Sequence, residues 1–294
     1  MSESDSTQPS AGSLPRVFGV LGYPVAHSRS PATHQAAMKV LGLPHDYHAF
    51  AVKPAELAAA LRGARALGLG GLNLTVPHKR AAVELVDALT ETARRIGAVN
   101  TVIVEPSRLV GDNTDALGFA RAVRELGGPP IKRAVLLGAG GASRAIIDAL
   151  RRAPPPPADT SWEPLRQPVQ ISWVSRQVDG MPSFPGVRPT TWDQVNDALV
   201  GADLLINATT VGMPNGPTGF PVPVDPSRLP NEARVIDIVY PRPTWGLLDA
   251  AAQAGKSIQD GLPMLLWQGV GALERWLGKP LPPEAIAAMR QALV

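Results

Sequence analysis

Cysteine is absent from the 294-residue chain. Its absence excludes a disulfide framework, a thiolate metal site and a cysteine nucleophile, so any chemistry must use other side chains. Aromatic residues make up only 5% of the chain, and 28 basic residues barely outnumber 25 acidic ones. A nucleic-acid-binding module would need clustered basic residues and aromatic platforms, so we expect no nucleic-acid partner.

Long apolar runs are also lacking. No stretch supplies the roughly 18 uninterrupted apolar residues that a membrane span requires. The first residues, MSESDSTQPSAGS, have no basic start followed by an apolar run. We therefore expect a cytoplasmic protein with no membrane partner. The small and polar residues of positions 1–14 predict a disordered tail.

Short apolar runs and alanine-rich helical stretches alternate along the rest of the chain. Strands are predicted at 17–22, 48–52 and 71–76, and helices at 31–41 and 54–67. The same rhythm resumes with strands at 133–138, 169–174, 203–208 and 233–239, and it ends with helices at 262–277 and 283–293. This order predicts an α/β fold in two domains, with ligands at the carboxyl ends of the strands.

Local signals mark some of the predicted boundaries. Ser30 is predicted as the N-cap of the first helix, with Gly42 just beyond its last turn. The proline-rich stretch at 153–168 cannot be a helix interior and predicts a surface excursion.

A glycine-rich loop, Gly138 to Ala142, follows the fourth predicted strand and leads into a helix. Glycines let the backbone approach a pyrophosphate, and the helix N-terminus supplies free amide donors. This pattern indicates a dinucleotide site, although an ordinary tight turn would look similar. After the next strand come Ser175 and Arg176 rather than an acid, which favours NADP; Asp179 could still bind a ribose, so NAD stays open.

Polar residues follow the strands of the N-terminal half. Ser28 and Ser30 lie after the first strand, where two neutral hydroxyls could bind a ligand carboxylate, although Ser30 could simply cap its helix. The strand ending near Pro77 is expected to bring to the same sheet edge Asn73, Thr75, His78 and Lys79.

Lys79 is the favoured candidate for proton transfer. Oxidising an alcohol by hydride transfer needs a group that removes the hydroxyl proton, which a lysine in a water-poor cleft can do. A single lysine is otherwise usually a solvated surface charge. Asn100 and Asp115 are further cleft candidates, because an Asp opposite a Lys can orient the same hydroxyl, unless Asp115 merely caps its helix. The five histidines lack zinc-ligand spacing, so we expect no metal.

Taken together, these segments resemble the shikimate dehydrogenase family. The motifs are S-x-S-P at 28–31, N-x-T-x-P-H-K at 73–79, G-A-V-N-T at 97–101, N-T-D at 113–115, G-A-G-G-A at 138–142, N-A-T-T-V-G-M at 207–213, D-I-V-Y at 237–240 and G-x-x-M-L-x-x-Q at 261–268. Their order and spacing match the family, and they cover nearly the whole folded chain.

The resemblance implies a substrate-binding domain of residues 15–112 plus 262–294 and a Rossmann-like NADP-binding domain of residues 113–261, with the active-site cleft between them. It implies reversible NADPH-linked reduction of 3-dehydroshikimate to shikimate, in chorismate and aromatic amino acid biosynthesis. Lys79 and Asp115 would be catalytic. The implied substrate-binding residues are Ser28, Ser30, Thr75, Asn100, Asp115, Tyr240 and Gln268. The implied cofactor-binding residues are Gly138, Ala139, Gly140, Gly141, Ala142, Ser175, Arg176, Ile238, Gly261 and Met264.

One departure from the family pattern bears on the cofactor. The family's adenosine-phosphate segment, N-R-T-x-x-R, reads SRQVDG at 175–180, so one of two arginines is missing. A proline-rich stretch replaces the helix that normally follows. An NAD-dependent quinate/shikimate or aminoshikimate dehydrogenase stays open as an alternative. A catalytically silent dinucleotide-binding regulator would be expected to lack Lys79 or Asp115, and both are present. A monomer and a homodimer fit equally.

Overall fold

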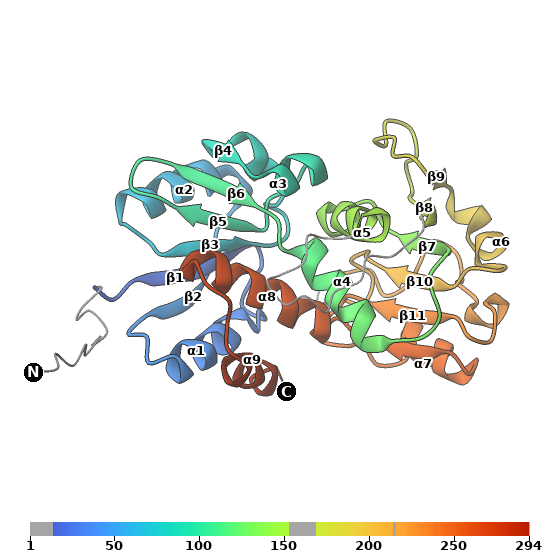
Figure 1. Ribbon diagram of the computed structural model, residues 1–294. Coiled ribbons are helices and arrows are strands. Elements are labelled where there is room, and N and C mark those ends of the chain that lie inside the picture. Colours follow the sequence, from blue (N-terminus) through green and yellow to red (C-terminus); the bar gives the residue numbers. More distant parts are fainter. Residues whose placement is uncertain (1–13, 153–168, 214–215, 294) are drawn as a thin grey trace, which may run out of the picture.

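Two six-stranded sheets form the framework of the molecule (Figure 1). The computed structural model describes residues 14–152, 169–213 and 216–293. The predicted tail, apart from Leu14, and the predicted excursion at 153–168 lie outside these residues. Each sheet carries helices on its faces, so the predicted α/β class is confirmed.

The first sheet is mixed: both of its edge strands pair in parallel, and β5 in its interior is antiparallel to its neighbours. Its order is β2-β1-β3-β5-β6-β4, with β1 parallel to β2 and β3, and β5 antiparallel to β3 and β6. The strands are β1 Val17–Gly22, β2 Asp46–Ala51, β3 Gly71–Leu74, β4 Ala88–Leu89, β5 Thr101–Val104 and β6 Leu109–Asp112. The helices between them are α1 Ser30–Val40, the 3-10 turn η1 Pro54–Glu56, α2 Leu57–Ala66, the 3-10 turn η2 Ala81–Glu84 and α3 Glu91–Ile96.

The second sheet is entirely parallel, in the order β12-β11-β10-β7-β8-β9. Its strands are β7 Arg133–Leu137, β8 Gln170–Val174, β9 Val187–Thr190, β10 Leu204–Asn207, β11 Arg234–Asp237 and β12 Ser257–Gln259. Its helices are α5 Gly141–Arg151, α6 Val195–Leu199 and α7 Leu247–Gln253, with 3-10 turns η3 Trp192–Gln194 and η4 Pro226–Arg228. The strand order reverses between β7 and β10, and such a switch point is where doubly wound sheets bind their ligands.

Two helices connect the sheets. α4 (Asp115–Leu126) leads from the first sheet to the second, and α8 (Leu262–Leu277) returns, followed by α9 (Pro283–Gln291), which packs on α1 (Figure 1). α4 and α8 cross closely at Gly118, where an added Cβ would lie 2.8 Å from the carbonyl oxygen of Met264. This close crossing holds the two sheets beside each other.

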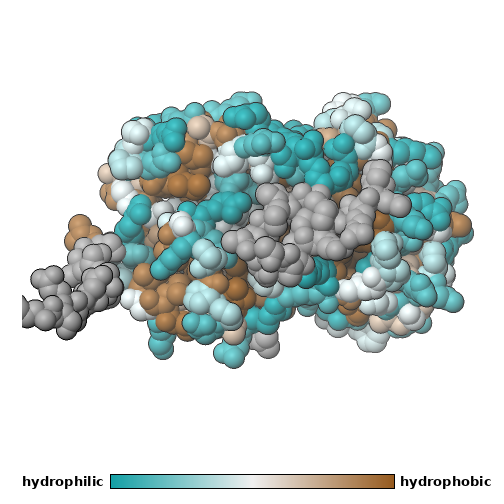
Figure 2. Space-filling view, viewed as in Figure 1, coloured by the Kyte–Doolittle hydropathy of each residue, from teal (hydrophilic) through white to brown (hydrophobic). Residues whose placement is uncertain are grey.

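Apolar side chains form the cores on the faces of both sheets, each strand of the second sheet contributing to them. Figure 2 shows hydrophilic side chains over most of one face, with hydrophobic patches over the part that holds the first sheet. No helix within the described ranges is both long enough and apolar enough to span a membrane.

Two predicted helix starts need correction. α1 begins at Ser30 itself, its N-cap is Arg29, and no side chain caps it, so the prediction of Ser30 as the cap is wrong. The hydroxyl of Ser28 instead accepts a hydrogen bond from the backbone N–H of Ser30, at 3.3 Å. The helix predicted at 54–67 begins as η1, because Pro54 opens a tight turn before α2 starts at Leu57.

Candidate active site

A pocket lies between the carboxyl ends of the two sheets. Loops after β1 and β3 and the start of α4 line one wall, and loops after β7, β10 and β11 line the other. Of the predicted site residues, the pocket is lined by Ser28, Ser30, Asn73, Thr75, Lys79, Asp115, Gly140, Gly141, Ala142, Ile238, Tyr240, Gly261, Met264 and Gln268.

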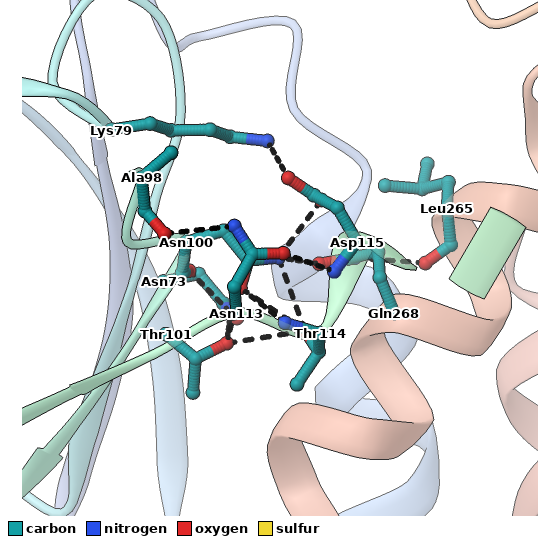
Figure 3. Close-up of polar contacts among 10 residues, drawn as sticks. All are labelled: Asn73, Lys79, Ala98, Asn100, Thr101, Asn113, Thr114, Asp115, Leu265 and Gln268. Atoms are coloured by element: carbon teal, nitrogen blue, oxygen red, sulfur yellow. Dashed lines mark hydrogen bonds and ion pairs between the residues drawn. The ribbon is translucent and has the colours of Figure 1, made fainter. Parts of the chain in front are cut away.

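The centre of the first wall is an ion pair between Lys79 and Asp115. Lys79 Nζ donates to Asp115 Oδ2 at 2.7 Å, and the two side chains point toward each other (Figure 3). The Lys79 side chain is 18% exposed and that of Asp115 only 4%. The pair is therefore largely shielded from solvent, while the lysine still reaches the pocket.

Asp115 is held by its neighbours and does not act as a helix cap. It is the first residue of α4, with Thr114 at the N-cap position, and its backbone N–H donates to Asn113 Oδ1 at 3.0 Å. Asn113 Nδ2 in turn donates to the carbonyl oxygen of Ala98 at 2.9 Å. The carboxylate is thus free to serve Lys79, which removes the alternative that Asp115 merely caps its helix.

Asn100 fixes the second oxygen of the same carboxylate. Its Nδ2 donates to Asp115 Oδ1 at 2.9 Å and contacts Gln268 Oε1 at 3.3 Å (Figure 3). Its Oδ1 accepts the backbone N–H of Thr114 at 2.8 Å, which sets which way the amide faces. Both carboxylate oxygens therefore have defined partners, so the rotation of the Asp115 side chain is fixed.

A second layer of hydrogen bonds supports Asn100 from within the sheet. Asn73 on β3 donates through Nδ2 to the carbonyl oxygen of Asn100 at 3.1 Å and to Thr101 Oγ1 at 3.2 Å. Its Oδ1 accepts from the hydroxyl of Tyr47 at 2.8 Å, and the Tyr47 ring stacks on His34 with centroids 4.2 Å apart. The first wall is thus anchored in the core by side-chain contacts that run from α1 to α4.

Three hydroxyl groups gather at another part of the pocket: Ser28, Ser30 and Tyr240. Burial raises the pKa of Tyr240, and this is opposed by a hydrogen bond with Ser28 and by the positive charge of Arg29. Tyr240 therefore stays protonated, and all three groups can donate hydrogen bonds to an anion.

His78 does not reach this pocket. Its Nε2 bonds the carbonyl oxygen of Val52 at 2.8 Å, and burial lowers the pKa of its imidazole. The expectation that His78 joins Lys79 at the working edge is therefore wrong, because successive side chains leave this loop in different directions. Among the described residues, no group of three or more histidine and carboxylate side chains could hold a metal ion.

The glycine loop of the second wall offers backbone rather than side chains. Gly138 has φ +101, and an added Cβ would lie 2.7 Å from the carbonyl oxygen of Ala208, so only glycine fits the turn after β7. A Cβ on Gly140 would meet no atom within 4 Å, and this glycine is the N-cap of α5 without any side-chain cap. The open space and the free amides of the first turn fit a phosphate group.

The two walls meet at Gly141. A Cβ there would lie 3.3 Å from Cβ of Lys79. Ile238 and Gly261 also pack together, since a Cβ on Gly261 would overlap the carbonyl oxygen of Ile238.

Four predicted cofactor residues lie away from the pocket lining. Gly138 and Ala139 form the turn beneath it, and Ser175 and Arg176 follow β8. The Ser175 hydroxyl accepts the backbone N–H of Gln177 at 3.3 Å, and the Arg176 side chain is exposed. The structure therefore places Arg176 at the carboxyl edge of the second sheet, outside the pocket lining.

Some pocket residues were not predicted as site residues: Val20, His27, Leu74, Val76, Ala208, Thr209, Thr210, Met213, Val239 and Leu265. In the sequence, the segment after β10 stands out only as the motif N-A-T-T-V-G-M. Asn207 Oδ1 accepts from the Thr209 hydroxyl at 2.7 Å, and Asn207 Nδ2 donates to Asp237 Oδ1 at 3.0 Å. The signal that could have found these residues is strand order, because β10 pairs with β7 and so brings its loop to the switch point.

Comparison with known proteins gives a consistent result. A family model for the shikimate dehydrogenase substrate binding domain matches residues 20–102, and one for the shikimate 5'-dehydrogenase C-terminal domain matches residues 261–294. The shikimate dehydrogenase (NADP(+)) of Geobacter metallireducens is 41% identical over 270 residues, which cover 91% of this chain and 93% of that protein. The shikimate dehydrogenase (NADP(+)) of Methanopyrus kandleri is 40% identical over 285 residues, which cover 95% and 94%.

Solved structures agree with these relatives. The crystal structure of shikimate 5-dehydrogenase from Thermus thermophilus, in complex with NADP(H) and shikimate, superposes with a TM-score of 0.77 at 37% identity. The match covers 94% of this chain and 99% of that one.

Proposed function

The chain belongs to the shikimate dehydrogenase family, and from that premise we propose that it catalyses the reversible NADP-linked reduction of 3-dehydroshikimate to shikimate. The reaction belongs to chorismate and aromatic amino acid biosynthesis. The observation that carries this proposal is the shielded Lys79–Asp115 pair, 2.7 Å apart, in a pocket whose other wall is the glycine loop. A proton-transfer group and a dinucleotide loop in one pocket are what an alcohol dehydrogenase requires.

Under this proposal the substrate lies against the first wall. Ser28, Ser30 and Tyr240 bind its carboxylate, because neutral hydroxyls hold an anion without burying a second charge. The ring hydroxyls are bound by the remaining predicted substrate residues that line the pocket, Thr75, Asp115 and Gln268. Asn100, also predicted as a substrate residue, is outside the lining and supports Asp115 from behind. Residues 15–112 with 262–294 then form the substrate-binding domain and residues 113–261 the cofactor domain.

The second wall holds the cofactor. Gly138, Ala139, Gly140, Gly141 and Ala142 bind the pyrophosphate through backbone amides, and Ser175 and Arg176 bind the adenosine end. Ile238, Gly261 and Met264 surround the nicotinamide. Bound there, NADP(H) supplies or accepts the hydride. Arg176 favours NADP, as do the names of the relatives at about 40% identity.

Lys79 moves the proton. In the reducing direction its ammonium group donates a proton to the substrate oxygen as hydride reaches the carbon, so the carbonyl becomes a hydroxyl. Asp115 keeps Lys79 Nζ pointed at that oxygen through the 2.7 Å bond, and Asn100 keeps Asp115 in place. The lysine regains its proton from solvent through its 18% exposed side chain. In the oxidising direction each step reverses.

The deciding experiment compares initial rates of nicotinamide reduction with shikimate at saturating NADP and NAD, with quinate as the control substrate. NADP-dependent turnover of shikimate alone is the expected result. Equal or faster turnover with NAD or quinate would move the protein to the NAD-dependent quinate/shikimate alternative. No turnover with any pair would contradict the proposal and favour a silent dinucleotide-binding regulator. A cytoplasmic location and a monomeric or dimeric state stay predictions.

A further inference from the structure

An ion pair ties the first sheet's helices to the second sheet's helices at a distance from the pocket. Arg95 on α3 donates to Asp148 on α5 through two parallel bonds, Nε to Oδ1 at 2.6 Å and Nη2 to Oδ2 at 2.9 Å. Within residues 14–152, 169–213 and 216–293, no other side-chain ion pair joins the 17–112 part to the 133–259 part.

The bidentate geometry of this pair restrains the orientation of the two side chains as well as their distance. A bidentate guanidinium–carboxylate contact fixes the relative orientation of its two groups more tightly than a single bond does. The Asp148 side chain is 9% exposed and that of Arg95 25%. Three other charges lie near the pair: Glu91 is 3.4 Å from Arg95 with an 86% exposed side chain, Arg152 is 3.9 Å from Asp148, and Arg144 on α5 lies against Gly97 at the end of α3.

The N-terminal end of α5 also meets the first part of the chain, at the pocket. α5 starts at Gly141, which lies against Lys79 and Ala98, since an added Cβ would be 3.3 Å and 3.6 Å from their Cβ atoms. The segment that follows α3 is joined to Lys79 by the bond from Val99 N to the Lys79 carbonyl oxygen, at 2.7 Å. α5 is therefore held at its N-terminal end by Lys79 and Ala98 and farther along by Arg95, with Ile96 of α3 in the apolar cluster between them.

The Arg95–Asp148 contact restrains the angle at which α5 lies against the first part of the chain. Asp148 is seven residues beyond Gly141, about 10 Å along the helix at a rise of about 1.5 Å per residue. If α5 tipped by about 5° about Asp148, Gly141 at the other end of this lever of about 10 Å would move by about 1 Å relative to Lys79. Displacements of about that size between reacting groups can cost on the order of a hundredfold in rate.

We propose that Arg95 and Asp148 are positioning residues that set the distance between the glycine loop and the Lys79–Asp115 pair. The inference rests on the proposed function, because it concerns the geometry of hydride and proton transfer. The pair touches neither substrate nor cofactor. It acts by holding α3 and α5 in register, so that a ring bound beside Gly141 faces the carbon whose oxygen Lys79 serves.

The test uses the full-length chain with Arg95→Ala, Asp148→Ala and the double variant. Each single variant should lower kcat for NADP-linked shikimate oxidation by about tenfold, well inside the hundredfold range of such displacements. The dissociation constant for shikimate measured without cofactor should change less than about twofold, because the first wall is intact. The double variant should lose no more than either single one, since the two residues act through one contact.

Controls separate positioning from stability. Arg95→Lys keeps the charge and one bond and should recover part of kcat, and Asp148→Asn serves if an alanine variant fails to fold. Arg108→Ala removes a 2.6 Å ion pair with Glu105 that lies within the first part alone, and it should leave kcat unchanged.

Two results would overturn the inference. One is a lower melting temperature in the Arg95 and Asp148 variants with kcat within twofold of wild type, which would make the pair merely stabilising. The other is an equal loss of shikimate affinity, which would place the effect in the first wall. If the wild-type chain itself turns over no shikimate, the proposed function fails first, and the inference falls with it.

Discussion

The two walls of the pocket are built in opposite ways. On the first wall the working groups are side chains, and Lys79, Asp115 and Asn100 are locked to one another by hydrogen bonds of 2.7 and 2.9 Å. On the second wall the turn from Gly138 to Gly140 presents backbone to open space. Rigid side chains suit the proton-transfer step, in which atoms must be aligned. Exposed backbone suits the binding of a dinucleotide, whose phosphates can accept hydrogen bonds from backbone amides.

This contrast predicts different kinetic signatures for the two walls. Substitutions in the first wall should lower kcat, because they disturb groups that act in the transition state. Substitutions in the cofactor-binding loops of the second wall, after β7 and β8, should raise KM for the cofactor and leave shikimate binding alone.

The sharpest test of the first wall is Lys79→Ala. Removing the proton-transfer group should lower kcat by about a thousandfold, within the range for general acid–base catalysis, and leave shikimate affinity within a few-fold. Steady-state rates and calorimetric titration with shikimate measure both. Lys39→Ala, an exposed lysine at the end of α1, is the matched control and should behave as wild type. Near-normal turnover by Lys79→Ala would show that another group moves the proton.

Asn100→Ala tests whether the network, rather than the lysine alone, makes the first wall work. It leaves Asp115 Oδ1 without its 2.9 Å partner in a site where Asn100 is 1% exposed. Asp115 then loses a bond that fixes its rotation and so misaligns Lys79, and displacements of about 1 Å can cost on the order of a hundredfold, so kcat should fall by roughly ten- to a hundredfold.

The control for Asn100 is Asn196→Ala, which removes a surface bond to the Pro223 carbonyl oxygen at 2.9 Å. It should change kcat by less than about twofold. Unchanged kcat in Asn100→Ala would mean that α4 alone keeps the Asp115 carboxylate in place. The first wall would then depend less on side-chain hydrogen bonds than we infer.

Many features of the fold and the site could be predicted from local patterns in the sequence, whereas contacts between distant segments could not. The strand at 17–22 and the helix at 262–277 were predicted with their observed bounds, because apolar runs and boundary residues mark them. The bond from Asn100 to Gln268 joins residues 168 apart in sequence, and no local pattern indicates it. The direction of His78 was missed for the same reason, since its partner, the Val52 carbonyl, lies on another segment.

The pH dependence of stability tests the role of His34, which supports the first wall by stacking on Tyr47. Burial lowers the pKa of His34 from 6.5 to about 4, so the folded state disfavours its protonated form. The unfolded chain binds a proton below pH 6.5 while the folded chain does so only near pH 4, so stability falls as pH decreases between these values. From pH 7.5 to pH 5 this linkage should remove about 2 kcal/mol of unfolding free energy.

The measurement is urea unfolding of wild type and His34→Gln at pH 7.5 and pH 5. The variant is expected to be less stable at pH 7.5, because it loses the stacking on Tyr47, but it should lack the His34 share of the pH dependence. Equal pH dependence in both proteins would show that His34 is not the group responsible.

Arg176→Ala is expected to have the smallest effect. It tests whether a side chain of the second wall selects NADP over NAD. The Arg176 side chain is exposed, and the family's second arginine is replaced by Gly180, so a single solvated cation would contact the ribose phosphate. Charge pairs in such exposed places contribute up to about 1 kcal/mol, which corresponds to roughly a fivefold rise in KM for NADP. KM for NAD should not change, because NAD lacks the phosphate, and kcat with shikimate should stay at its wild-type value. Gln177→Ala, one residue along the same loop, is the control. A loss of kcat in Arg176→Ala would contradict the division of labour between the walls, whereas an unchanged KM for NADP would move the phosphate contact to another residue of the 175–180 segment.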